Sequence, residues 1–155
     1  ELASSAMRQK KKVYMSFALA TNTSLLVMDE PTNGLDIPGK SQFRKFIASG
    51  MSDEKTIIIS THQVKDVDDL LEHVIAMDSN KVLLNESVSE ICQKLLFVET
   101  SSNDSAEEAL YVSPSIQGKS MILPNKENEE SAINLELLFN ALLAETDKLK
   151  VYLQN

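Results

Sequence analysis

Two adjacent carboxylates, Asp29 and Glu30, directly follow the apolar run Leu25 to Met28. Four apolar residues without polar alternation predict a strand that is buried on both faces of a parallel sheet. In open parallel sheets the ligand crevice lies beyond the carboxyl ends of the strands, so we expect the two acids where a substrate binds. Neighbouring side chains of a strand point to opposite faces, and the two carboxylates should therefore have different roles.

A histidine is expected at the same edge of the sheet. Pro38 to Gly50 predicts a helix, and Thr56 to Ser60 predicts a second fully buried strand that ends shortly before His62. A strand–helix–strand unit makes a right-handed crossover between parallel strands, which places His62 beside Asp29 and Glu30. A lone histidine is more often structural than catalytic, so both interpretations stand at this point. The predicted helix has its apolar face at Phe43, Phe46 and Ile47.

The run Asp29 to Asp36 (DEPTNGLD), with the apolar strand before it, resembles the Walker B motif and D-loop of ATP-binding-cassette (ABC) ATPases. The resemblance implies that Asp29 holds Mg²⁺, mainly through water, that Glu30 polarises the attacking water, and that Asp36 organises the contact with a second subunit. It also implies that His62 is the switch histidine, which contacts the γ-phosphate of ATP and helps to orient Glu30. Such roles fit phosphoryl transfer, which depends on positioning and charge stabilisation. The alternative is a core strand followed by a polar turn.

Ser4 to Ala20 predicts a helix that Ser4 or Ser5 can cap, with an anion site at its start. The beginning of this helix is similar to the form of the ABC signature motif Leu-Ser-x-Gly-Met-Arg-Gln-Lys. Two residues depart from that form: Ala3 replaces leucine, and Ala6 replaces the glycine that lets backbone and phosphate come close. The resemblance implies that the nucleotide-binding residues are Ser4, Ser5, Ala6, Met7, Arg8 and, in the D-loop, Asp36. The basic run from Arg8 to Lys12 is expected to be a solvated helix face.

Residues Gly34 to Ser41 match the phosphate-loop pattern Gly-x4-Gly-Lys-Ser. Such a loop aims backbone N–H groups at phosphates, but Pro38 has no N–H and Asp36 would place a negative charge among them. The D-loop interpretation explains the same residues more completely. If the phosphate loop built on Lys40 is rejected, the sequence has no Walker A lysine, and we expect that the chain alone does not hydrolyse ATP.

The remaining sequence predicts a series of shorter elements. Val64 to Leu71 predicts an amphipathic helix continuing past a structural His73, and Val74 to Leu84 predicts a strand–turn–strand. Ser87-x-x-Glu90 is a capping box for a short helix that carries Ile91, Leu95 and Leu96. Further expectations are a loop over residues 100–108, strands over 109–112 and 120–123, and one long helix over 135–153. The apolar stripe of that helix should pack on the chain's own small sheet or, alternatively, on a partner such as a second copy.

Length and composition bound the possibilities. The 155 residues suffice for one core and a small appendage, and a net charge of −8 argues against a nucleic-acid-binding surface. The single cysteine, Cys92, excludes a disulfide framework within the chain and suits a reducing cytosol. No apolar run is long enough to span a bilayer, so we expect any membrane connection to come through a partner. Glu1 is expected to lie in the middle of a domain, which predicts that the chain is a fragment.

The fold class predicted is therefore α/β: part of a P-loop NTPase (ABC ATPase) parallel sheet with flanking helices in residues 1–86, and a small α+β appendage in residues 87–155. The resemblance implies an ATP- and Mg²⁺-dependent subunit of the ABC-2-type exporter branch. It would pair with a second ABC ATPase subunit, act on a transmembrane permease, and lie at the cytoplasmic face of the cell membrane without inserting into it. Two alternatives are a catalytically inactive binding or regulatory module and a soluble tandem ABC protein.

Overall fold

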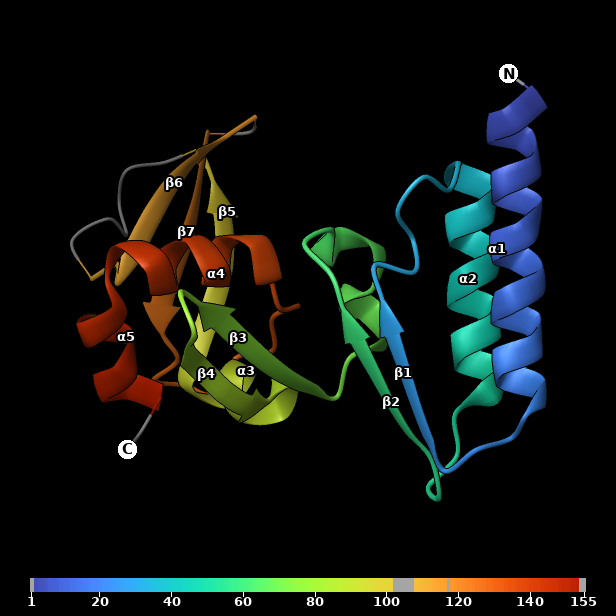
Figure 1. The fold of residues 1–155 in the computed structure, drawn as a ribbon. Coiled ribbons are helices and arrows are strands. Elements are labelled where there is room, and N and C mark those ends of the chain that lie inside the picture. The colour runs from blue at the N-terminus through green and yellow to red at the C-terminus, as the bar shows by residue number, and fades with distance from the viewer. Residues whose placement is uncertain (1, 102–107, 117, 154–155) are drawn as a thin grey trace. The chain divides into compact units, whose positions relative to one another are not determined.

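The computed structural model describes residues 2–101, 108–116 and 118–153. The chain forms two compact units, Glu1–Leu70 and Leu71–Asn155. Figure 1 shows the elements of each unit. In the described residues, the first unit holds a parallel strand pair with two α-helices and two short 3-10 helices, and the second holds an antiparallel hairpin, a three-stranded antiparallel sheet and three α-helices. The mixed α/β class predicted from the sequence is thereby confirmed.

The first unit is built on a strand–helix–strand arrangement. Strands β1 (Leu25–Asp29) and β2 (Thr56–Ser60) pair in parallel, from Leu25 opposite Thr56 to Asp29 opposite Ser60. Helix α2 (Ile37–Gly50) connects them, and helix α1 (Leu2–Ala20) precedes them. The parallel pairing confirms the predicted crossover and brings the ends of both strands to one edge.

Helix α2 begins and ends as its sequence predicts. Asp36 is its N-cap, and the carboxylate Oδ1 accepts a hydrogen bond of 2.9 Å from the Gly39 N–H. Pro38 stands in the first turn, where a missing N–H costs nothing. Phe43 and Ile47 are buried on the inner face of the helix.

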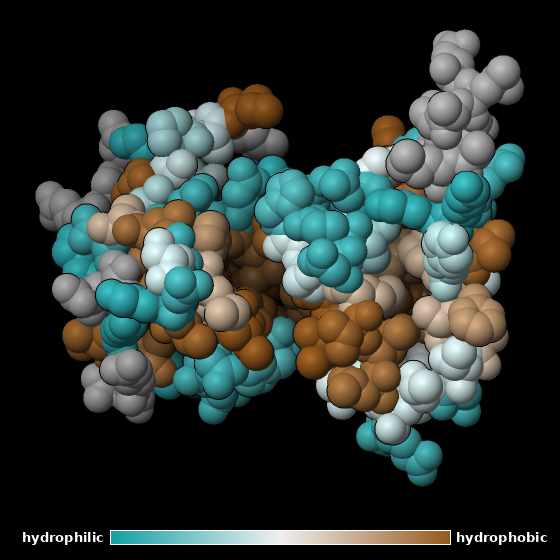
Figure 2. Space-filling model, viewed as in Figure 1, coloured by the Kyte–Doolittle hydropathy of each residue, from teal (hydrophilic) through white to brown (hydrophobic). Residues whose placement is uncertain are grey.

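The parallel strands are not buried on both faces, which corrects the prediction. Their side chains alternate between half-buried and exposed, and Val27 and Ile58 are 64% and 49% exposed. Within the first unit, α1 and α2 lie on the same side of the strand pair (Figure 1). Figure 2 shows hydrophobic residues at the surface over β1 and β2. The continuous apolar run therefore reflects a sheet with one uncovered apolar face in this unit.

Two local predictions in the first unit are also wrong. Helix α1 starts at Leu2, so Ser4 and Ser5 lie within the helix and do not cap it; the residues before them are good helix formers. The segment expected as an amphipathic helix forms two 3-10 helices, η1 (Val64–Asp66) and η2 (Asp68–Leu70). Their i→i+3 hydrogen bonds, such as Val67 N–H to Val64 O at 3.1 Å, replace the α-helical pattern.

The second unit opens with the predicted strand–turn–strand. Strands β3 (His73–Asp78) and β4 (Lys81–Ser87) form an antiparallel hairpin, and Ser79 and Asn80 both have positive φ, as tight hairpin turns require. His73 therefore begins a strand and is not helical; its Nε2 lies 2.9 Å from Asn85 Oδ1. Helix α3 (Val88–Lys94) follows, and Ser87 Oγ accepts from the Glu90 N–H at 3.1 Å, which confirms the predicted cap.

A three-stranded antiparallel sheet follows α3, in the order β5–β7–β6. Strand β5 (Leu95–Thr100) was not predicted, because Leu95 and Leu96 fit the apolar face of the preceding helix. Strands β6 (Tyr111–Ser115) and β7 (Gly118–Pro124) correspond to the two predicted strands. Most of the predicted loop over residues 100–108 lies outside the described residues.

The long helix expected over residues 135–153 is two helices, α4 (Leu135–Ala144) and α5 (Thr146–Leu153). The break falls at Glu145, where the apolar stripe is interrupted by polar residues. Side chains of both helices are buried in the second unit's core, which confirms packing within the chain's own fold. Fully or almost fully buried there are Ile91, Leu95, Met121, Ile122, Leu138, Leu142 and Leu149.

Candidate functional site

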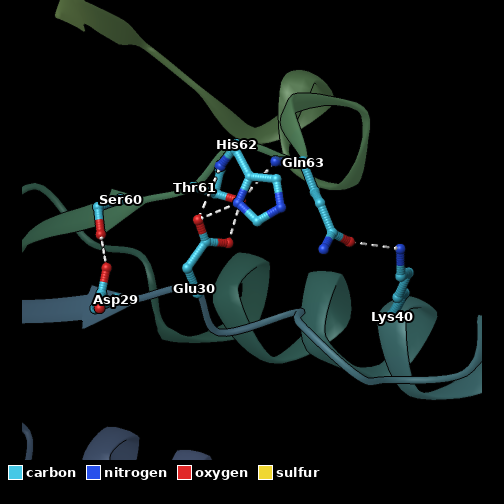
Figure 3. Close-up of polar contacts among 7 residues, drawn as sticks. All are labelled: Asp29, Glu30, Lys40, Ser60, Thr61, His62 and Gln63. Carbon is cyan, nitrogen blue, oxygen red and sulfur yellow. Dashed lines mark hydrogen bonds and ion pairs between the residues drawn. The ribbon is translucent and has the colours of Figure 1, made fainter. Parts of the chain in front are cut away.

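The carboxyl ends of β1 and β2 bring the predicted catalytic and metal-binding residues together. Asp29 is the last residue of β1, and Glu30 follows it with φ +44°. The Glu30 N–H donates to Ser60 O at 2.8 Å, so the ladder between the strands continues one residue past β1. Ser60 Oγ donates to Asp29 Oδ1 (Figure 3). Asp29 and Glu30 are thus each tied to β2 at this edge.

Three donors from the chain just after β2 hold the Glu30 carboxylate (Figure 3). Thr61 Oγ1 donates to Oε2 at 3.1 Å, and the His62 N–H donates to Oε1 at 3.0 Å. The His62 Nδ1 lies 2.5 Å from the same Oε1. The hydrogen bond from the His62 side chain is the main cause that lowers the pKa of Glu30 below its ordinary value, and the other two donors add to it. Glu30 is therefore a carboxylate at neutral pH.

The pairing also fixes which nitrogen of the His62 ring carries a proton while Glu30 is ionised. An ionised carboxylate only accepts hydrogen bonds, so Nδ1 must carry a proton to donate to Glu30. Nε2 can then donate to a ligand only when the ring is doubly protonated and positively charged. The His62 side chain is 71% exposed and the Glu30 side chain 28%, so the ring is accessible to a ligand while the carboxylate is partly covered.

Asp29 offers a suitable ligand for Mg²⁺. Its carboxylate is exposed at the tip of β1 and provides hard oxygen donors beside the Ser60 hydroxyl. Mg²⁺ keeps several waters and needs only one or two protein carboxylates, so a single aspartate at a strand tip fits the ion. In the described part of the chain no cluster of three or more His, Cys, Asp or Glu side chains is arranged for direct coordination.

The phosphate-loop alternative is inconsistent with the structure. Helix α2 already begins at Ile37, before Gly39, and the Gly39 N–H is used by the Asp36 carboxylate. The Lys40 Nζ lies 2.7 Å from Asp66 Oδ2 and donates to Gln63 Oε1 at 3.2 Å. A lysine engaged in this way, next to a capped helix start, lacks the open cradle of N–H groups that binds phosphate.

The signature-like residues Ser4, Ser5, Ala6, Met7 and Arg8 lie in the first turns of α1. Their predicted contact with a nucleotide stays a prediction, as does the contact of Asp36 with a second subunit. Further along α1, Lys11 Nζ donates to Asn33 O at 2.5 Å and so ties the helix to the turn after Glu30.

Sequence reasoning missed several residues that shape the site. Ser60 and Thr61 supply hydroxyl donors to Asp29 and Glu30, and their place at the end of an apolar strand was a usable signal. Lys40 and Asp66 form a partly buried ion pair between residues far apart in the sequence. No local pattern marks such a pair.

Comparison with known proteins finds partial similarity to ABC transporter ATP-binding proteins. No protein-family model matches the chain. The energy-coupling factor transporter ATP-binding protein EcfA2 of Mycoplasmoides gallisepticum is 32% identical over 94 residues, 61% of this chain and 30% of that protein. The ABC transporter ATP-binding protein NatA of Bacillus subtilis is 35% identical over 88 residues, 57% of this chain and 35% of that protein. An uncharacterized ABC transporter ATP-binding protein of Methanocaldococcus jannaschii is 26% identical over 131 residues, 84% of this chain and 48% of that protein.

The chain thus spans between 30% and 48% of the length of these relatives. No helix in the described residues is long and apolar enough to cross a membrane. The relatives agree with the family suggested by the motif around Asp29 and Glu30. Over part of its length, this chain is a homologue of ABC transporter ATP-binding proteins.

Proposed function

We propose that Glu30 and His62 form the water-activating part of an ABC-type ATPase site, in a subunit that couples ATP hydrolysis to export through a membrane partner. The observation that carries this proposal is the Glu30 carboxylate held by three donors, with His62 Nδ1 at 2.5 Å. A fixed, ionised carboxylate at the carboxyl edge of a parallel sheet is suited to orient a water for attack on a phosphate.

Glu30 acts mainly by orienting and polarising that water. A carboxylate has about four lone-pair sites, two on each oxygen. Both donors from His62 bond to Oε1, and only Thr61 bonds to Oε2, so Oε2 can still accept a hydrogen bond from a water. The lowered pKa makes Glu30 a weak base, so it does not hold the water's proton at equilibrium. His62 fixes the carboxylate and, when its ring is charged, Nε2 donates to a phosphate oxygen.

Asp29 holds Mg²⁺ in this proposal, mainly through water. When bound, Mg²⁺ neutralises charge on the phosphate oxygens of ATP. Asp36 then lies at the contact with a second ATPase subunit, whose signature helix completes the site. Ser4, Ser5, Ala6, Met7 and Arg8 play that part for the site of the other subunit. The subunit acts beneath a transmembrane permease, at the cytoplasmic face of the membrane.

A chimera tests the proposed chemistry. Residues 2–87 of this chain replace the aligned segment of the Bacillus subtilis relative NatA, and ATP turnover is measured with and without Glu30→Gln. We expect the substitution to lower kcat by about 10²- to 10⁴-fold, because a positioned acid or base contributes on that order, while ATP binding changes little. Glu54→Gln removes an exposed carboxylate elsewhere in the same unit and is the matched control. Equal loss in both variants would contradict the role of Glu30.

A second candidate function is a binding or regulatory module without ATPase activity. The ion pair between Lys40 and Asp66 favours this function. Lys40 belongs to the only phosphate-loop pattern in the sequence, and because it pairs with Asp66 it is not available to bind a phosphate. Titration of the chain with a fluorescent ATP analogue and Mg²⁺, beside Lys40→Ala, separates the cases. We expect no saturable binding in either protein. Saturable binding that Lys40→Ala abolishes would restore the phosphate loop.

A further inference from the structure

Lys40 links helix α2 to the segment that carries His62. Its ammonium group lies between Asp66 Oδ2 at 2.7 Å and Gln63 Oε1 at 3.2 Å. Asp66 is buried, with its side chain 11% exposed, whereas the Lys40 side chain is 28% exposed. Among the described residues, Asp66 Oδ2 has no hydrogen-bond partner besides this ion pair. Removal of the lysine would leave a buried carboxylate without compensation.

The contacts of Lys40 continue to the Glu30 carboxylate through short steps (Figure 3). Gln63, which accepts from Lys40, donates its N–H to Thr61 Oγ1 at 2.9 Å. Thr61 Oγ1 in turn donates to Glu30 Oε2. On the other side, the Asp66 N–H donates to Gln63 O at 3.1 Å, and the adjacent Val67 is 2% exposed. His62 therefore stands between two residues, Thr61 and Gln63, that this network holds in place.

We propose that Lys40 is a positioning residue for the catalytic pair: through Asp66 and Gln63 it fixes residues 61–67 so that Thr61 and His62 stay bonded to the Glu30 carboxylate. That this positioning serves catalysis rests on the proposed function. The positioning itself can be tested in the chain without ATP. Lys40 occurs in a sequence pattern typical of a phosphate-binding lysine, but here it supports the pair of Glu30 and His62 instead of binding a phosphate. Helix α2, whose start Asp36 caps, supplies the fixed base for this contact.

Amide hydrogen exchange reports the positioning directly, because the N–H groups of His62 and Gln63 donate to Glu30 Oε1 and Thr61 Oγ1. We would measure the exchange rates of these two amides in the whole chain by NMR at one neutral pH. Lys40→Ala and Asp66→Asn should both raise the two rates by about 10-fold or more, because the hydrogen bonds that protect the amides open more often. Lys40→Arg should keep them slow, because the guanidinium can still pair with Asp66. Lys45→Ala, which removes an exposed lysine from the same helix, is the matched control and should leave both rates unchanged.

Lys40→Ala separates positioning from simple electrostatics. Amide exchange at neutral pH is catalysed by hydroxide, so loss of a nearby positive charge, acting through space alone, would slow the exchange of the two amides, whereas loss of their hydrogen bonds speeds it. Repeating the measurement at about 1 M salt, where the Debye length is about 3 Å, reduces the through-space part further. Unchanged or slower exchange in a folded Lys40→Ala protein would overturn the proposal.

Two additions keep the test decisive. Far-UV circular dichroism shows whether each variant is folded, and Gln63→Leu, which loses only the neutral contact to Lys40, serves if Lys40→Ala unfolds. A smaller rise in the exchange rate of the His62 amide is expected for Gln63→Leu, and no rise would overturn the proposal. In the NatA chimera, Lys40→Ala should lower kcat by about 10-fold or more with KM for ATP within about twofold, and Lys40→Arg should restore it. If Glu30→Gln leaves turnover intact but the changes in amide exchange occur, the positioning stands and the proposed catalytic role of Glu30 fails.

Discussion

Glu30 combines a left-handed backbone with a side chain that three donors hold. A φ of +44° is unfavourable for a residue with a Cβ, and such conformations persist where the surroundings determine them. Here the N–H to Ser60 and the three donors to the carboxylate hold it. The same arrangement puts the acid at the edge of the sheet, so local backbone strain and the placement of the functional group have one cause.

The lowered pKa of Glu30 predicts how this residue affects stability with pH. In the folded state its carboxylate is favoured, so its contribution is complete above the ordinary pKa of 4.5 and is lost as pH falls through the lower folded-state pKa. Wild type and Glu30→Gln should therefore differ most in the free energy of unfolding near neutral pH and converge in acid. Urea unfolding at a series of pH values from about 7 to 3 measures the difference. A gap that widens in acid would contradict the assigned hydrogen bonds.

Helix α2 carries two phenylalanines that differ in burial, so we expect their substitution to change the free energy of unfolding by different amounts. Phe43 is 1% exposed and Phe46 is 36% exposed, although both were predicted on one apolar face. Phe43→Ala should cost about 3–5 kcal/mol because it opens a cavity in the core, whereas Phe46→Ala should cost about 1 kcal/mol or less because the ring is already partly hydrated. Urea unfolding of the first unit, followed by the circular dichroism of α1 and α2, gives both values. Equal costs would mean that the helix is rotated from the position described.

The elements near the site were predictable because they follow short-range rules. The apolar runs predicted β1 and β2, Pro38 predicted the start of α2, and the crossover rule then brought Glu30 and His62 together. The turn between β3 and β4 follows such a rule too, because Ser79 and Asn80 are residues typical of turns, and both have positive φ in the structure.

Other features depend on contacts that no local pattern records. An apolar run indicates a strand but not whether a second layer covers it, so the exposed face with Val27 and Ile58 was not foreseen. Leu95 satisfies helical spacing and yet starts a strand, because its tertiary partner is β7. The ion pair of Lys40 and Asp66 joins two elements through the fold, so its position could be known only from the structure.

The two units of the whole molecule differ in charge. Residues 1–70 contain nine basic and nine acidic residues, whereas residues 71–155 contain six lysines and fourteen acidic residues, so the net charge of −8 lies entirely in the second unit. The acidic charge that disfavours nucleic-acid binding therefore belongs to the second unit, and the unit with the candidate site is neutral overall. Like charges within a compact unit repel one another and destabilise it at low ionic strength.

This asymmetry predicts a selective effect of salt on unfolding. Each unit has its own buried core, so thermal unfolding should show separate transitions, and only that of the second unit should rise in temperature between about 0.05 M and 0.5 M sodium chloride, because salt screens its repulsion. Calorimetry of the whole chain measures both transitions.

Two core variants assign those transitions. Leu142 is fully buried in the second unit, so Leu142→Ala should remove about 2–5 kcal/mol from the salt-sensitive transition and leave the other in place. Phe43→Ala should do the reverse. Because Glu30 and His62 belong to the first unit, their pairing should survive Leu142→Ala, with the pKa of Glu30 still low. A single transition that both variants shift would show that the units unfold as one, and the candidate site would then depend on the stability of the whole chain.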